Sequence, residues 1–103
     1  MTSGVYSITC AATKDRYVGQ SINIERRWQA HRNAMIRAIR RRYSNLDGST
    51  NLLIQALAVR HGVESFRFGI LEACDRLELL NRERFWIEKL CPTLNSSRPR
   101  SPA

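Results

Sequence analysis

The stretch "GVYSITCAATKDRYVGQ", Gly4 to Gln20, decides the fold of this 103-residue chain. Two short runs of β-branched and aromatic residues flank "AATKDR", which has the composition of a turn, so the pattern predicts a two-stranded hairpin. Each predicted strand carries a tyrosine close to a glycine, Tyr6 and Tyr17. Strands favour aromatic residues simply because they pack well. From the residues alone, both tyrosines therefore read as core residues, with a functional role left open.

The segment after the hairpin predicts a long helix. Asn23 is a suitable N-cap for a helix from about Ile24 to Arg42. Apolar residues recur along it with helical spacing, and arginines crowd the remaining faces: the apolar positions are Ile24, Trp28, Met35 and Ile39. A turn-rich stretch, "YSNLDGSTN", follows this helix.

The second half of the chain predicts two helices around a strand. Ser49 or Thr50 could cap a helix in "NLLIQALAVRH", which Gly62 would end in a left-handed conformation. The alternation in "SFRFGILEA" predicts a third strand. Asp75 could cap a third helix from about Arg76 to Leu90, and Pro92 would stop it. The tripeptide "TLN" is expected to return briefly to the sheet.

This order of elements, β-β-α-α-β-α, predicts an α+β fold in which helices flank a small three-stranded, mainly antiparallel sheet. We expect one domain over residues 1–95. The last residues, "SSRPRSPA" (96–103), have nothing to bury, so we expect them to be a disordered tail.

The composition narrows the class of function. Lys and Arg total 17 against 9 Asp and Glu, a formal net charge of +8, and a basic domain of this size favours nucleic acid as its partner. The three cysteines match no zinc or disulfide pattern, so we expect free thiols. No run reaches the roughly 18 apolar residues of a membrane span, and the start "MTSGVY" is unlike a signal peptide. We therefore expect a cytoplasmic, non-secreted protein of a bacterium or phage-infected host, without membrane partners.

Two polar residues lie on apolar helix faces and need an explanation. Glu83 falls within the stripe of the third helix formed by Leu79, Leu80, Trp86, Ile87 and Leu90. A carboxylate there must be paired, bind a metal or reach solvent or an arginine at the stripe's edge. His31 lies at the rim of the first helix's stripe, and Arg27 lies one turn before it. The pair reads either as core-edge packing or as a phosphate clamp with a proton carrier.

Taken together, the motifs resemble the GIY-YIG nuclease family, particularly the catalytic domains of phage-type homing endonucleases. "GVY" (4–6) and "YVG" (17–19) are similar to the two signature tripeptides, with valine in place of isoleucine. "QSINIERRWQAH" resembles the family stretch that carries a helical arginine and a histidine. "HGVESFRFGILE", "NRERFWIEKL" and "TLN" resemble the later strand, the glutamate helix and the asparagine. Some relatives carry a further histidine where this chain has Ser49.

The resemblance implies an endonuclease that hydrolyses DNA phosphodiester bonds with one divalent ion, Mg²⁺ or Mn²⁺, held by Glu83. It implies that Tyr6 is the general base and that Arg27 grips the phosphate and lowers the pKa of Tyr6. It places Tyr17 and His31 in the same cluster, either of them relaying the proton, and Asn95 at its edge. A binding module of the same fold that has lost cleavage is the alternative.

The arginine-rich helix completes the expected DNA contacts. We expect a sequence-blind track for phosphates, or else a solvated face, from Arg26, Arg27, Arg32, Arg37, Arg40, Arg41 and Arg42. Because family members gain specificity from added domains, this chain is expected to be weakly specific or to work with a separate domain or partner protein. Whether the DNA is single- or double-stranded or branched stays open, with Trp28 and Tyr43 as possible stacking residues.

Overall fold

The computed structural model describes residues 1–41 and 51–95, and its elements follow the expected β-β-α-α-β-α order. Three short 3₁₀ turns join or follow the main elements: η1 (Val63–Ser65), η2 (Arg76–Glu78) and η3 (Thr93–Asn95). The strands and helices are β1 (Gly4–Cys10), β2 (Arg16–Ser21), α1 (Ile24–Arg41), α2 (Leu52–His61), β3 (Phe66–Ala73) and α3 (Leu79–Leu90). None of the described helices is both long and apolar enough to cross a membrane.

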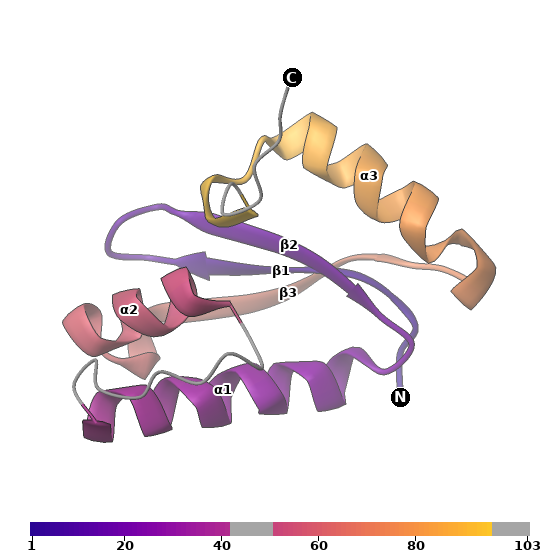
Figure 1. Cartoon of the computed structure of the whole chain (residues 1–103). Helices are drawn as coiled ribbons and strands as arrows, with labels where there is room; N and C mark the ends of the chain where they lie inside the picture. Colours follow the sequence, from indigo (N-terminus) through magenta and orange to yellow (C-terminus); the bar gives the residue numbers. More distant parts are fainter. Residues whose placement is uncertain (42–50, 96–103) are drawn as a thin grey trace.

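The three strands form one antiparallel sheet in the order β2-β1-β3, so β1 is central (Figure 1). The hairpin between β1 and β2 closes through backbone hydrogen bonds between Cys10 and the turn, where Lys14 adopts a positive φ of 71°. The β1–β3 register shifts between Val5 and Tyr6. At this point only glycine fits at position 4, because a Cβ there would lie 2.1 Å from the carbonyl oxygen of Glu72.

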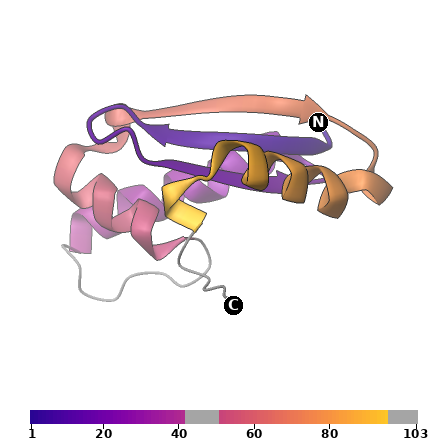
Figure 2. The same ribbon diagram turned by 90° about the horizontal axis from the view of Figure 1, so that it is seen from above.

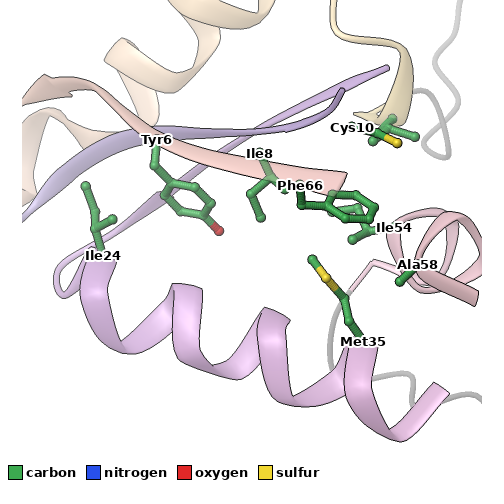
Figure 3. Packing of buried hydrophobic residues seen from close by; sticks show 9 residues of the cluster. Tyr6, Ile8, Cys10, Ile24, Met35, Ile54, Ala58 and Phe66 are labelled. Atoms are coloured by element: carbon green, nitrogen blue, oxygen red, sulfur yellow. The ribbon is translucent and has the colours of Figure 1, made fainter. Parts of the chain in front are cut away.

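One face of the sheet carries the main core, under α1 and α2. Alternate residues of β1, namely Tyr6, Ile8 and Cys10, point to this face and are fully buried. Figure 3 shows Tyr6 and Ile8 projecting from β1 toward α1, where Ile24 and Met35 rise to meet the sheet. The period of two in the strand and 3.6 in the helix thus produces one apolar interface.

The other face is covered by α3, which packs on β2 and β1 (Figures 1 and 2). Glu72 of β3 ties this helix to the sheet, because its Oε1 accepts hydrogen bonds from Arg82 Nε and Trp86 Nε1, both at 2.9 Å. The sheet is therefore a central layer between α1 and α2 on one side and α3 on the other.

Several expected boundaries were wrong by a few residues. Asn51, rather than Ser49 or Thr50, caps α2 by accepting a hydrogen bond from the Ile54 N–H. Gly62 does end α2 with a positive φ of 87°, although its ψ of 152° is not left-handed helical. Residues 76–78, expected in the third helix, form the turn η2 instead, and α3 begins at Leu79.

Two further expectations were corrected. "TLN" (93–95) does not rejoin the sheet as a strand but forms η3, which contacts β2 through side chains. Leu80 was expected in the inward stripe of α3, but it is 68% exposed. The expected disorder of residues 96–103 and all but the last residue of the expected turn at 43–51 lie outside the described residues. All three cysteines are free, as expected.

Candidate active site

A buried hydrogen bond between a tyrosine and a histidine lies under α1. The hydroxyl of Tyr6, from β1, is 3.1 Å from Nε2 of His31, from α1. The two side chains are 0% and 1% exposed. The sequence placed His31 at the rim of the apolar stripe, whereas the helix turns it fully inward. Polar groups at this depth must find partners inside the protein, and these two find each other.

A second tyrosine joins the pair from the edge strand. Ile8 of β1 faces Tyr17 of β2, and Tyr6 faces Gly19, so both tyrosines lie on the α1 face. Their ring centroids are 6.2 Å apart, and the Tyr17 ring is 5.5 Å from His31. Tyr6 and His31 are fully buried, but Tyr17 is half-buried. The cluster therefore runs from the protein interior toward the surface.

Gly19 provides the space in which the Tyr6 ring lies. A Cβ at position 19 would come within 2.6 Å of the Tyr6 hydroxyl oxygen and 2.9 Å of a ring carbon of Tyr17. The sequence left open whether this glycine serves a turn or gives close access for substrate. In the structure, the missing side chain makes room for the two tyrosines themselves.

Arg27 lies one turn before His31 in α1 and affects the pKa of Tyr6. Burial raises the pKa of Tyr6 above its usual value, and the nearby Tyr17 adds to this increase. The Arg27 guanidinium lowers the pKa of Tyr6 through its charge and a hydrogen bond, but burial outweighs it. The expected lowering by Arg27 is therefore present, although the overall shift is upward, which corrects the expectation from sequence.

The same environment keeps the imidazole of His31 neutral. Burial, followed by the positive charge of Arg27, lowers the pKa of His31 from 6.5 to about 4. At neutral pH the Tyr6 hydroxyl is protonated and His31 is uncharged, so Nε2 can accept the hydroxyl proton. His31 Nδ1 is buried and has no hydrogen-bond partner among the described groups. The pair is thus a hydrogen bond between two neutral groups, and burial disfavours the charged form of each.

Asn95 holds the edge strand from outside the sheet. Its Oδ1 accepts a hydrogen bond from the Val18 N–H and its Nδ2 donates to the Val18 carbonyl, both at 2.8 Å. Val18 lies between Tyr17 and Gly19 in β2. Asn95 therefore uses its amide to fix the backbone that carries Tyr17, which is a positioning role.

Glu83 lies on α3, on the opposite face of the sheet from Tyr6. It is half-buried, and it shares the inward side of the helix with Leu79, one turn before, and Trp86. α3 packs on the edge strand β2 and runs in the opposite direction, so its first turns lie toward the end of β2 at Ser21 (Figure 1).

The other carboxylates of the described residues have identifiable surroundings. Glu72 binds Arg82 and Trp86, Asp15 accepts from Thr93 Oγ1 at 2.7 Å, and Glu25 accepts from Thr2. The rest are exposed, namely Glu64, Asp75, Glu78 and Glu88. Residues 1–41 and 51–95 contain no group of three or more histidine, cysteine or acidic side chains that could hold a metal. A lone carboxylate fits a hydrated Mg²⁺, which keeps waters as its other ligands.

The arginines of α1 lie on two flanks. At 100° per residue, Arg32 is about 140° around the helix from Arg27, on the side away from Arg26. A hollow of about 310 Å³ lies beside Arg26 and Arg27 and is lined also by Met1, Ser21, Ile22, Asn23 and Ala30. Arg26, Arg32 and Arg40 are exposed and Arg37 is half-buried. The side chain of Arg41 and the whole of Arg42 lie outside the described part.

The sequence did not reveal the contacts that hold β2 from the C-terminal side. Thr93 donates to Asp15, and its hydroxyl also lies 3.4 Å from the Arg16 N–H, which donates to it. These partners are 77 or 78 residues apart, so no local pattern indicates them. The role of Trp28, whose ring packs edge-on against Tyr6 at 6.4 Å, was also missed.

Comparisons with known proteins identify the family and the fold. The family model described as the GIY-YIG catalytic domain matches residues 2–95. The solved catalytic domain of the homing endonuclease I-TevI is similar, with a TM-score of 0.69 and 27% identity over 90% of this chain and 92% of that one. A mutant of the same domain has a TM-score of 0.68 and 28% identity over 88% of this chain and 86% of that one. No curated protein matches the sequence significantly.

Proposed function

This chain belongs to the family of GIY-YIG catalytic domains, which implies DNA endonuclease activity, and we propose that it cleaves DNA with the help of one divalent metal ion. The observation that carries the proposal is the cluster of Tyr6, Tyr17, His31 and Arg27 on the α1 face of the sheet. It combines two hydroxyls, a neutral imidazole and a guanidinium, which are the groups that phosphodiester hydrolysis requires.

Tyr17 is the hydroxyl that meets the attacking water in this proposal. Tyr6 has no exposed surface, whereas Tyr17 is half-buried and lies between Tyr6 and the outside. Tyr6 remains the base next in line, because its own proton can pass to His31 Nε2 over 3.1 Å. The water proton then moves inward along Tyr17, Tyr6 and His31, and the phosphate on Arg27 offsets part of the positive charge that helps to hold the pKa of His31 low.

Arg27 binds the scissile phosphate. Its guanidinium lies close enough to Tyr6 to lower that tyrosine's pKa, so a phosphate on Arg27 is held beside the hydroxyl cluster. As the water oxygen bonds to phosphorus and the bond to the 3′ oxygen breaks, the charge on the phosphate oxygens grows. A guanidinium placed there stabilises this charge more in the transition state than in the ground state.

Glu83 is the metal ligand in this proposal. The expected ion, Mg²⁺ or Mn²⁺, would supply a Lewis acid that neutralises the phosphate and the leaving oxygen. Glu83 is half-buried on α3, which packs on the edge strand β2 and on β1. The end of β2, near Ser21, is the place where side chains from both faces can approach one phosphate. The hollow beside Arg27 is lined by Ser21 and supports this location.

DNA binding outside the proposed active site is proposed to be independent of base sequence. Exposed Arg26 and Arg40 and half-buried Arg37 lie along α1 outside the tyrosine cluster, where they suit phosphates rather than base edges. We therefore expect low intrinsic sequence specificity, with any target choice supplied by a separate domain or partner.

The test is cleavage of supercoiled plasmid with Mg²⁺, with Mn²⁺ and with a chelator. We expect nicking that needs the metal and falls at least 10²-fold in Glu83→Gln. Glu88→Gln is the matched control, because Glu88 is exposed on the same helix and outside the site. Equal cleavage by Glu83→Gln and Glu88→Gln would contradict the metal assignment.

The alternative, a binding module without catalysis, makes a different prediction in the same experiment. Such a protein would shift plasmid in a gel at low salt, owing to its net charge of +8, but would never nick it in any metal.

A further inference from the structure

A second hollow lies on the other flank of α1, between this helix and β3. It has a volume of about 240 Å³, and its lining side chains are Glu25, Trp28, Gln29, Arg32 and Phe68. Sites for drug-sized ligands typically have volumes of about 300–1,000 Å³. This hollow is smaller, so it suits a single planar group of limited size.

Two aromatic rings form the inner wall of this hollow. Trp28 and Phe68 pack with ring centroids 5.5 Å apart and an interplanar angle of 67°, and both side chains are only half-buried. The Trp28 ring also packs edge-on against Tyr6 at 6.4 Å. One tryptophan therefore borders both the hollow and the proposed catalytic cluster.

The polar groups of the hollow have opposite charges. Arg32 is exposed at its border. The Glu25 carboxylate accepts hydrogen bonds from the Thr2 N–H at 2.7 Å and the Thr2 hydroxyl at 2.6 Å, which lower its pKa and keep it ionised. The Trp28 indole nitrogen is buried and has no hydrogen-bond partner among the described groups. A ligand with an anionic group, a flat ring and polar ring edges would match this set.

We propose that this hollow binds an unpaired nucleobase of the DNA strand that is being cut, an inference that rests on the proposed function. The base stacks on Trp28 and Phe68, and Arg32 holds the phosphate beside it. Glu25 can accept a hydrogen bond from an exocyclic amino group.

The position of the hollow identifies the kind of DNA. An α-helix with its side chains is about 10–12 Å across, so a short stretch of strand can cross α1 from Arg27 to Arg32. A base reaches a protein hollow only when it is unstacked. The preferred substrate is therefore DNA with an unpaired base next to the cleaved bond, as in a bulge, a branch or a single strand.

Trp28 itself can report the binding. The chain has two tryptophans, and Trp86→Phe leaves Trp28 as the only one. The protein carries Glu83→Gln as well, so that it does not cut the probes. It is titrated with three 20-bp duplexes: one with a single bulged adenine, one with an abasic site in the bulge and one fully paired. We expect the adenine bulge to quench Trp28 fluorescence and to bind about tenfold more tightly than the other two.

Two variants test whether the preference for the bulged base comes from the side chains of this hollow. Arg32→Gln removes an exposed side chain without threatening the fold, and Phe68→Leu shortens one aromatic wall. Each should reduce the tenfold preference to about twofold or less. Arg60→Gln, which removes the same charge from an exposed position on α2, should weaken binding of all three duplexes alike and leave their ratio unchanged.

The proposal is overturned if the three duplexes bind equally and leave Trp28 fluorescence unchanged, or if Arg32→Gln and Arg60→Gln keep the same preference. Metal-dependent nicking of plasmid by the unmodified protein is measured separately. A hollow that binds no base, in a protein that still nicks DNA, would refute this inference and leave the endonuclease assignment intact.

Discussion

The two faces of the sheet hold their polar groups in different ways. On the α1 face, Tyr6 and His31 are completely buried, uncharged at neutral pH and bonded to each other. On the α3 face, Glu72 is only half-buried and is charged, with Arg82 and Trp86 as its partners. The first arrangement keeps two neutral groups bonded away from solvent, and the second holds a helix in place.

This difference indicates how a small domain can combine two kinds of chemistry. A hydrogen bond between side chains is stronger where water is excluded, whereas a hydrated metal ion needs a carboxylate within reach of solvent. A single core could not offer both, but two faces that meet at an edge strand can. We expect the α1 face to be the reactive one and the α3 face to contribute to it.

Among the residues of the α1 face, substitution of Arg27 should reduce DNA cleavage the most. Arg27→Gln removes the charge that would stabilise the phosphate, so cleavage should fall about 10²–10³-fold, with the fold retained. Arg76→Gln, an exposed arginine of η2, is the control in single-turnover cleavage. Similar losses in both variants would mean that Arg27 contributes only general attraction for DNA.

Burial of neutral His31 should make stability depend on pH. The folded pKa of His31 is about 4, against 6.5 for the ordinary value, so between these limits the unfolded chain binds more protons. The free energy of unfolding should therefore fall by about 3 kcal/mol as pH drops from 7 through 4. Urea unfolding at several pH values measures this.

The matching variants are His31→Gln and His61→Gln. His31→Gln should flatten the pH dependence of the free energy of unfolding. His61→Gln measures how much of that dependence comes from the other histidine. If His31→Gln unfolds with the wild-type pH dependence, the imidazole is not the group that is held neutral by burial.

A smaller difference, in stability, is expected between alanine substitutions of two glycines that lie on opposite faces of the sheet. Gly19→Ala places a methyl group against Tyr6 and Tyr17 and should cost about 1–3 kcal/mol of stability, together with cleavage activity. A Cβ at Gly69, which faces the α3 side, would meet only Ser7 Oγ at 3.5 Å. Gly69→Ala should therefore be close to neutral in thermal unfolding. Equal losses from both changes would mean that the space over Gly19 is not special.

Local patterns in the sequence were sufficient to predict most of the fold. Alternation gave the strands, helical spacing gave the helices, and Asn23 and Asp75 do cap the segments that follow them. These signals act within a few residues, so they survive without knowledge of the tertiary structure. For the same reason, the prediction that Tyr6, Tyr17, Arg27 and His31 cluster came from the family motifs rather than from any local pattern.

Properties that depend on packing could not be predicted. The hydrogen bonds between Asn95 and Val18 join residues 77 apart in the sequence, and they form only because η3 packs beside β2. The net pKa of Tyr6 depends on a balance between burial and Arg27 that no spacing indicates. The inward stripe of α3 was also misjudged at Leu80, because hydrophobicity alone does not say which side of a helix meets the sheet.

The most direct test of the central claim is a double-mutant cycle across the sheet, with Tyr6→Phe on one face and Glu83→Gln on the other. Single-turnover cleavage rates are measured for the wild type, both single variants and the double variant. If the two faces serve one phosphate at the end of β2, the double variant should be hardly slower than the worse single variant. Losses that simply multiply would show that the two side chains act independently, and the account of a shared site would be wrong.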